Sequence, residues 1–225
     1  MPARWRSALF FWSLQSGGIL THTSALAHPL VLTTGFGPFE DCERNPSREV
    51  AERLEAEPAP GLRFVSRVLP VSFERAPAEI DRFLEEWRGK EEEPALFMAL
   101  GVQRDPGYRL EVRARARLLR HDRPDTDGVH AVEAGLRDGP RDGPDRFTTL
   151  DLEELVRALR HRGVNDAVVS HDAGGYVCEC AYFRVLERVS DRGFSALFVH
   201  VPPERFAPVE RQVEVCRWIA MEALS

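Results

Sequence analysis

The segment AVVSHDAGGYVCECAYFRVLERV, residues 167–189, contains one complete strand–turn–helix unit. Its start, Ala167 to Ser170, predicts a short buried strand, and the run Ala173-Gly174-Gly175 then bends the chain. From Tyr176 to about Val189, apolar residues recur at the spacing of a helix. A strand followed by a turn and a helix is typical of proteins in which helices cover a mostly parallel sheet.

The same alternation of strand and helix patterns extends from Pro29 to the C-terminus. Asn45-Pro46, for example, supplies a helix cap followed by proline at the first helical position. We therefore expect an α/β fold, with a single domain over residues 29–225 whose mixed, mostly parallel twisted sheet has helices on both faces. The predicted strands cover residues 30–34, 62–69, 95–100, 108–119, 167–170 and 196–201, and the predicted helices cover 46–56, 76–87, 152–162, 176–189 and 209–224.

The composition is that of a soluble globular protein, with 43% hydrophobic and 29% charged residues among 225. A formal net charge of -6 argues against a nucleic-acid partner, because proteins that wrap nucleic acid carry a basic excess. The longest early apolar run, Ala8 to Leu14, is far shorter than the roughly 20 residues of a membrane span. The four cysteines lack the paired CxxC spacing of a zinc ribbon, and they are too sparse for a disulfide scaffold in a chain of this length. A reducing compartment is the simpler expectation, so we expect a cytoplasmic protein.

The N-terminal segment, residues 1–28, has two open interpretations. Arg4 and Arg6 precede the apolar run, and Ala25-Leu26-Ala27 has the form of a signal cleavage site, so the segment is ordered like a secretory signal. Gln15 to Gly18, however, interrupt its apolar core. One interpretation is an exported protein. The other is an extension, or a misassigned start codon, in front of a cytoplasmic domain.

Cys178 is a candidate nucleophile, because it follows the glycine turn and lies in the first turn of the predicted helix. The N-terminus of a helix favours negative charge and so promotes the thiolate. Cys180 lies about 200° further around the helix, on a face shared with Arg184 and Glu187, and cannot share this role. The alternative interpretation of Cys178 is a small buried hydrophobic residue, as most free cysteines are.

A thiol nucleophile needs a base and a group that orients the base. His200 fits the base, because it ends a predicted strand directly before Pro202-Pro203, at the edge where α/β active sites gather. His171 is its one competitor. Glu111 and Asp172 are both candidates for the orienting carboxylate, and the residue pattern alone does not choose between them.

The stretch from residue 108 to residue 146 divides into two parts. Polar and apolar residues alternate over 108–119, which predicts a strand with Glu111 on its charged face. Residues 121–146 are rich in Asp, Gly, Pro and Arg, and they predict a long loop that is functional or mobile. The arginines of the strand are expected to face solvent: Arg113, Arg115 and Arg117.

Three stretches share the pattern of one enzyme family: VLTTGFGPFEDCERNP at 31–46, SHDAGGYVCECAYF at 170–183 and FVHVPP at 198–203. In these motifs and in their order the chain resembles the pyroglutamyl peptidase I (pyrrolidone-carboxylate peptidase) family of cysteine peptidases. The resemblance implies a phosphorylase/hydrolase-like fold and an enzyme that removes N-terminal pyroglutamate from peptides. It also implies a homo-oligomer, commonly a tetramer, and no metal or cofactor.

The resemblance also implies roles for individual residues. By match to the family's motifs, Cys178 is the nucleophile, His200 is the general base and acid, and Glu111 orients His200. Asp172 is then structural. A neutral five-membered lactam needs aromatic faces and a polar partner for its ring amide. The residues that match the family's ring-binding set are Phe36, Phe39 and Asn45.

Two positions depart from the family's motifs: Ala116, where an asparagine is usual, and Gly175. Ala116 and the arginine-rich strand motivate a second hypothesis, a catalytically weak or inactive relative that binds pyroglutamyl-type termini. A third hypothesis is a metal site, although the helix geometry separates its two cysteines. Its candidate ligands are His171, Asp172, Cys178, Cys180 and His200.

Overall fold

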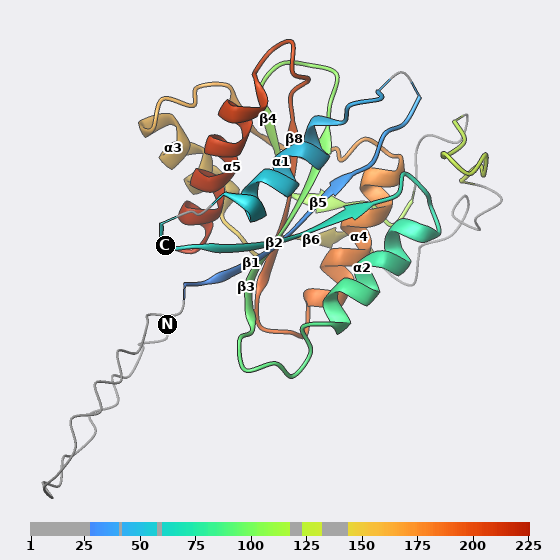
Figure 1. Ribbon diagram of the computed structural model, residues 1–225, viewed down its shortest axis with the longest axis horizontal. Coiled ribbons are helices and arrows are strands. Elements are labelled where there is room, and N and C mark those ends of the chain that lie inside the picture. The colour runs from blue at the N-terminus through green and yellow to red at the C-terminus, as the bar shows by residue number, and fades with distance from the viewer. Residues whose placement is uncertain (1–27, 41, 58–59, 118–122, 132–143) are drawn as a thin grey trace, which may run out of the picture.

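A six-stranded sheet runs through the computed structural model, which describes residues 28–225 except 41, 58–59, 118–122 and 132–143 (Figure 1). Neighbouring strands are parallel except for one antiparallel pair, the fourth and fifth strands in sheet order, so the predicted mixed, mostly parallel sheet is confirmed. In sheet order the strands are β2 (Arg63–Leu69), β1 (Leu30–Phe36), β3 (Pro94–Val102), β8 (Ser195–Val201), β4 (Tyr108–Glu111) and β7 (Ala167–Ser170).

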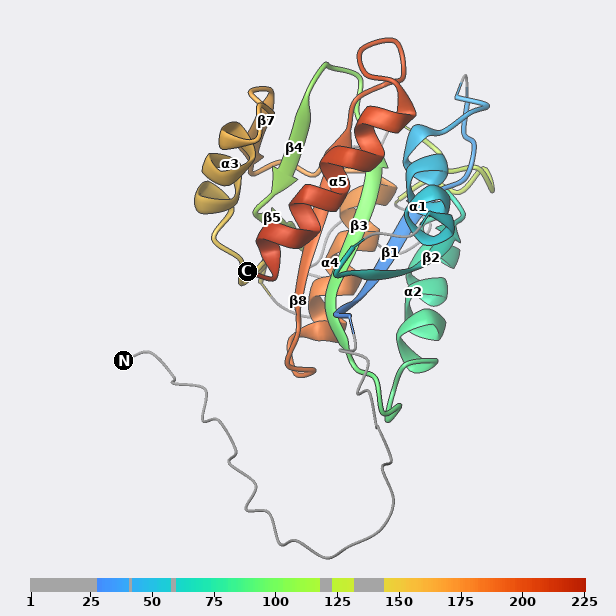
Figure 2. The same ribbon diagram turned by 60° about the vertical axis from the view of Figure 1, so that its left-hand side comes forward.

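Helices cover both faces of this sheet (Figures 1 and 2). Helices α2 (Arg75–Glu85) and α4 (Val177–Val189) pack on one face, and α1 (Pro46–Ala56), α3 (Leu152–His161) and α5 (Val209–Ala223) pack on the other. Successive residues of a strand point to opposite faces. In β8, accordingly, Phe198 belongs to the core under α4 and Val199 to the core under α5. His200 therefore lies on the α4 face, together with Phe198.

The predicted strand over 108–119 is wrong in its length. Strand β4 ends at Glu111, and Val112 then bonds outside the ladder: its N–H donates to Ser170 O at 2.7 Å, and its carbonyl accepts from Thr148 N at 3.0 Å. The chain continues as β5 (Arg113–Ala114), which pairs with β6 (Arg146–Phe147) in a separate two-stranded sheet. The alternating pattern is real, but it is divided between two sheets.

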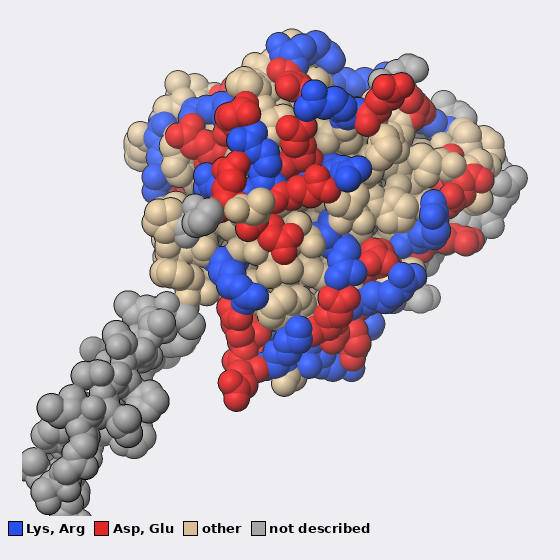
Figure 3. Space-filling view, in the orientation of Figure 1, with Lys and Arg blue, Asp and Glu red and all other residues tan. Residues whose placement is uncertain are grey.

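The surface carries charges of both signs. On the face drawn in Figure 3, acidic and basic side chains are interspersed over the helices. Arg53, for instance, bonds both Glu57 of its own helix end, at 2.7 Å, and Glu210 of α5, at 2.6 Å. Within the part of the chain that the structure describes, no helix combines the length and apolar character needed to cross a membrane.

Candidate active site

Strand register places His200 and Glu111 close together. Because β4 runs against β8, Glu111 lies opposite Phe198, two residues before His200 on the same face of β8. A diagonal pair of this kind is within reach of long side chains. His200 Nδ1 lies 2.8 Å from Glu111 Oε1. The two side chains thus form a hydrogen-bonded pair that the backbone ladder holds in place.

The pair is buried, with His200 6% and Glu111 0% exposed. The predicted alternation holds in β4, where Glu111 and Leu110 point to opposite faces, but helix α4 covers the face of Glu111 and keeps it from solvent. Tyr182 of α4 donates its hydroxyl to the Glu111 carbonyl at 2.8 Å. Glu111 Oε2 has no hydrogen-bond partner among the described residues, so His200 is the one group that its carboxylate bonds there.

Cys178 approaches the same place from helix α4. It is the second residue of the helix and half-buried, and it lines one pocket together with His200. The turn before the helix depends on Gly174 and Gly175, whose φ angles of 94° and 65° lie in the left-handed region that glycine tolerates. Gly175, a departure from the family's motif, thus has a conformational reason.

Cys180 is turned into the core, where its sulfur lies 3.5 Å from Phe73 O. Its predicted place among the charged residues of the helix is wrong, because α4 is covered on that side by α2 and by residues near it. The separation of the two cysteines holds nevertheless. Cys178 is the one of the two that lines the pocket.

The pKa of His200 reflects both its burial and its partners. Burial has the largest effect and lowers the pKa, but hydrogen bonds with Cys178 and Glu111, and the negative charges of these groups, raise it to about 9. An imidazole with this pKa is protonated at neutral pH. The protonated ring lies between Cys178 and the buried Glu111 carboxylate, where it can serve as a proton donor.

Gly101, the residue after the strand predicted over 95–100, makes room for this arrangement. It pairs with His200 across β3 and β8. A Cβ at this position would lie 3.2 Å from Cys178 Sγ and 2.8 Å from the Phe198 ring. The signal in the sequence is a glycine at the end of a buried strand, which indicates close approach of another group.

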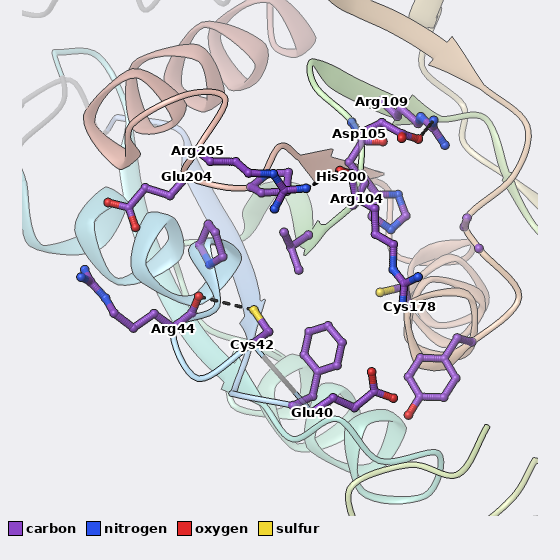
Figure 4. Close-up of a pocket in the computed structure, with 18 of the residues that line it drawn as sticks. Glu40, Cys42, Arg44, Arg104, Asp105, Arg109, Cys178, His200, Glu204 and Arg205 are labelled. Carbon is purple, nitrogen blue, oxygen red and sulfur yellow. Dashed lines mark hydrogen bonds and ion pairs between the residues drawn. The ribbon is translucent and has the colours of Figure 1, made fainter.

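The pocket around Cys178 and His200 has a volume of ≈ 1290 Å³ (Figure 4). Pockets for drug-sized ligands measure roughly 300–1,000 Å³, so this one has room for more than a five-membered ring. Of the predicted ring-binding residues, Phe39 lines the pocket. Phe36 and Asn45 are 3% and 4% exposed and are buried beside it.

Asn45 is committed largely to its own loop. Its Oδ1 accepts from Ser47 N at 3.2 Å and from Ser47 Oγ at 2.8 Å, and its Nδ2 donates to Gly37 O at 3.0 Å. The bond to Ser47 N confirms the predicted helix cap. One Nδ2 hydrogen remains for any other partner.

A buried carboxylate that the sequence reasoning missed, Glu179, supports the turn before Cys178. It accepts from Arg115 N at 2.6 Å and from Gly175 N at 3.0 Å, and the Arg115 guanidinium lies 3.3 Å from it. Arg115 also pairs with Asp172 at 2.8 Å. The expectation that the arginines of this strand face solvent is therefore wrong for Arg115, and Arg113 likewise pairs with Asp145 at 3.0 Å. The signal was an acidic residue in the first turn of a helix, reaching back to its N-terminus.

Part of the long loop also contributes to the pocket. Residues 121–122 and 132–143 lie outside the described residues, but Arg123 lines the pocket and Asp125 is 6% exposed. Asp125 accepts from Phe73 N at 2.9 Å, and Pro124 O accepts from the Tyr176 hydroxyl at 2.7 Å. The loop therefore touches the residue that caps α4.

The candidate metal ligands do not form a cluster. Among the residues that the structure describes, no group of three or more His, Cys, Asp or Glu side chains is arranged to hold a metal ion. Ala116, the other departure, is buried, and its N–H donates to Asp145 at 3.0 Å. It is not among the described residues that line the pocket.

Comparison with known proteins identifies the family. The model of the pyroglutamyl peptidase family matches residues 30–211. The chain belongs to the pyroglutamyl peptidase family. The pyrrolidone-carboxylate peptidase of Thermococcus onnurineus is 34% identical to this family member over 175 residues, covering 76% of the chain and 82% of the relative. That of Thermococcus litoralis is 30% identical over 175 residues, covering 76% of each protein.

Solved structures agree with this assignment to the pyroglutamyl peptidases. A mutant pyrrolidone carboxyl peptidase from Pyrococcus furiosus superposes with a TM-score of 0.75 at 26% identity, covering 87% of this chain and 98% of its own. The Thermococcus litoralis enzyme superposes with a TM-score of 0.74 at 26% identity, covering 87% and 93%. The resemblance inferred from the three sequence motifs is thus confirmed.

Proposed function

We propose that the protein is a cysteine peptidase that hydrolyses the bond after an N-terminal pyroglutamyl residue. The observation that carries the proposal is the buried Glu111–His200 pair, 2.8 Å apart, which shares a pocket with a cysteine in the first turn of a helix. This is the order of contacts that an activated nucleophile requires: a nucleophile, a base, and a group that orients the base. The family to which the chain belongs supports the same reaction.

In the first half of the reaction, the Cys178 thiolate attacks the carbonyl carbon of the pyroglutamyl residue. Protonated His200 gives its proton to the leaving nitrogen as the carbon–nitrogen bond breaks, which leaves a thioester on Cys178. In the second half, neutral His200 takes a proton from water, and the hydroxide displaces the sulfur. Glu111 stabilises the imidazolium at both stages. Pyroglutamate leaves, and the thiolate–imidazolium pair is restored.

The oxyanion of each tetrahedral intermediate needs preorganised donors. The N–H groups of Gly174 and Gly175 are already bonded, to Asp172 at 3.0 Å and to Glu179 at 3.0 Å. The first N–H groups of a helix, in contrast, have no partner within the helix. We therefore assign oxyanion stabilisation to the N–H groups of Val177 and Cys178.

For the pyrrolidone ring, Phe39 supplies an aromatic face inside the pocket. Phe36 and Asn45 remain predicted ring-binding residues. The bonds of Asn45 to Ser47 and Gly37 leave its second Nδ2 hydrogen as the donor for the ring carbonyl. The same bonds hold the loop that presents Phe39.

Hydrolysis of pyroglutamyl p-nitroanilide tests the proposal directly. We expect turnover by the protein, loss of turnover in Cys178→Ala, and most of the activity retained in Cys180→Ala, which removes a thiol from the same helix. Equal losses in both variants would contradict the assignment of the nucleophile. Binding of a pyroglutamyl peptide without turnover would instead favour the inactive relative.

Two broader expectations accompany this function. We propose a cytoplasmic location, which the four free cysteines of the chain support, since thiols persist in reducing compartments. We also propose a homo-oligomer, from resemblance to the family. Light scattering coupled to gel filtration measures the mass, and a monomer at working concentration would contradict that proposal.

A further inference from the structure

The pocket has a side for the ring and a side for the leaving peptide. His200 gives its proton to the leaving nitrogen, so the leaving peptide lies next to His200. Strand β3 separates β8 from β1, whose following loop bears Phe39. Since Gly101 of β3 pairs with His200, the loop after β3 passes beside the leaving group. In Figure 4, Glu40 and Cys42 of the Phe39 loop lie apart from Arg104 and Asp105 of the β3–β4 loop.

The loop after β3 is held firmly. Gln103 donates its N–H to Val201 O at 3.1 Å and its Nε2 to Gly107 O at 2.6 Å. Arg205, from the loop after β8, donates to Arg104 O at 3.0 Å. The backbone at Arg104 is thus fixed from both sides, and the start of its side chain is preorganised.

Apart from Arg104 and Arg205, the arginines that line the pocket have acidic partners. Arg109 pairs with Asp105 at 2.8 Å, Arg44 pairs with Glu49 at 2.9 Å, and Arg123 pairs with Glu40. The Arg104 guanidinium has no hydrogen bond or ion pair with any described residue. In Figure 4 it points into the pocket, toward the part that contains Cys178.

Neither Asp105 nor Glu204, two of the acidic residues that line the pocket, is paired with this cation. Asp105, its neighbour in the loop, is already paired with Arg109. Glu204 lies on the opposite side of the pocket in Figure 4, where its charge acts on Arg44. The side of the pocket that receives the leaving peptide therefore contains a guanidinium that forms no ion pair with a described carboxylate.

Building on the function proposed above, we propose that Arg104 is a specificity-determining residue that selects pyroglutamyl peptides with a carboxylate close to the scissile bond. Two sources supply such a carboxylate. One is an acidic side chain on the residue after pyroglutamate, and the other is the C-terminal carboxylate of a pyroglutamyl dipeptide. A guanidinium bonds either one with charge-assisted hydrogen bonds.

The test compares kcat/KM for matched substrates: pyroglutamyl-Gln-amide, pyroglutamyl-Glu-amide, pyroglutamyl-Lys-amide and pyroglutamyl-Gln with a free carboxylate. An exposed ion pair contributes up to about 1 kcal/mol, so we expect the acidic substrates to be favoured roughly two- to fivefold over the neutral amide. Preference for the Glu amide assigns the side chain as the source, and preference for the free acid assigns the terminus. Half-molar salt should reduce the preference, because it screens exposed charges.

Arg104→Gln should bring the ratio of acidic to neutral substrate close to one, and Arg104→Glu should favour the Lys amide. Arg88→Gln is the matched control, because Arg88 is exposed, pairs with Glu85 and is not among the described residues that line the pocket around Cys178 and His200. Its ratio should stay that of the unmodified protein. Equal kcat/KM for all substrates in the unmodified protein, with turnover retained, would overturn the role of Arg104 alone.

Absence of turnover with every substrate would instead overturn the proposed function. In that case calorimetry on Cys178→Ala still tests Arg104, by comparing the Kd of the Glu and Gln amides with and without Arg104→Gln. Tighter binding of the Glu amide that disappears with Arg104→Gln supports the role of Arg104. Equal binding overturns it.

Discussion

At the scale of single residues, the proposed chemistry depends on one buried pair, His200 and Glu111. His200 has a single described carboxylate partner, Glu111, and Glu111 has a single described hydrogen-bond partner, His200, for its carboxylate. A buried negative charge beside an imidazole favours the protonated ring. The pair therefore sets the pH range over which the proton for the leaving amine is available.

Activity is predicted to fall as pH rises through about 9, the pKa of His200. The proton that the leaving amine needs is present below this pH and lost above it, and kcat/KM reports ionisations of the free enzyme. In Glu111→Gln the pKa of His200 should fall, so the alkaline limb of the profile of kcat/KM against pH should move to lower pH. The value of kcat/KM should also drop by roughly 10²–10⁴-fold. Asp172→Asn, the other carboxylate that the residue pattern left open, should leave the limb in place. The same displacement in both variants would contradict the role of Glu111.

Gly101→Ala tests the close packing around the sulfur. The added Cβ would lie 2.8 Å from the Phe198 ring, whose centroid is 4.8 Å from that of His200. The Phe198 ring must shift, and it would displace the His200 ring that packs against it. A displacement of about 1 Å at a catalytic group costs on the order of a hundredfold in rate. We therefore expect a large loss of kcat/KM.

Gly193→Ala is the contrast for this variant. A Cβ at Gly193 meets nothing within 4 Å, but the φ of 77° is unfavourable for alanine. It should lower the free energy of unfolding by about 1–2 kcal/mol and leave kcat/KM unchanged. If Gly101→Ala behaved in the same way, the crowding argument would be wrong.

At the scale of elements, strands β4 and β8 hold two catalytic candidates and helix α4 holds the third. Tyr182 bonds α4 to the Glu111 carbonyl of β4. Glu179 bonds the N–H group of Arg115, the residue after β5, and that of Gly175 in the turn before α4. Burial raises the pKa of Glu179, and these N–H donors oppose the rise. The Glu179 carboxylate thus ties the helix that carries Cys178 to the residue that follows β5.

Glu179→Ala is predicted to lower the free energy of unfolding by roughly 2–4 kcal/mol, because it leaves two N–H groups without their partner. It should also reduce kcat/KM, since the glycine turn loses its support. Glu187→Ala, the same substitution on the same helix, removes a pair with Arg184 at a partly exposed site and should cost less than about 1 kcal/mol. Chemical denaturation and p-nitroanilide assays measure both effects. Equal destabilisation by the two variants would remove the special role of Glu179.

Most helices and strands could be predicted from the sequence, because caps, glycines and periodicity are local signals. Helix α1 begins at the predicted Pro46 and ends at the predicted Ala56. The strand over 108–119 could not be divided correctly, because the partners of its arginines are distant in sequence: Glu179 is 64 residues from Arg115.

The candidate site follows the same division. Cys178 could be predicted from its place in the first turn of a helix and His200 from its place at the end of a strand, without knowledge of the tertiary fold. The choice between Glu111 and Asp172 depends on an antiparallel register that no local pattern encodes. The motif resemblance favoured Glu111, and it is Glu111 that bonds His200.

At the scale of the whole molecule, the family match begins at residue 30, the first residue of β1. A shortened chain beginning at His28 is therefore predicted to fold and to keep its activity. Circular dichroism and hydrolysis of pyroglutamyl p-nitroanilide check this expectation. Insolubility of the shortened chain, beside a soluble full-length protein, would mean that residues 1–27 contribute to folding.

The two halves of the site are anchored unequally, and this has a consequence on heating. His200 and Glu111 are fixed by strand ladders inside the sheet, whereas Cys178 follows a turn with two left-handed glycines. His171, Asp172 and Gly174 of this turn are exposed, and the Gly174 N–H is bonded at the surface, to Asp172. Segments whose backbone hydrogen bonds are exposed to solvent open at lower free energy than the core. On heating, the enzyme should therefore lose activity at a lower temperature than it loses its helical circular dichroism signal. Brief heating between these two temperatures should leave a protein that regains full activity on cooling.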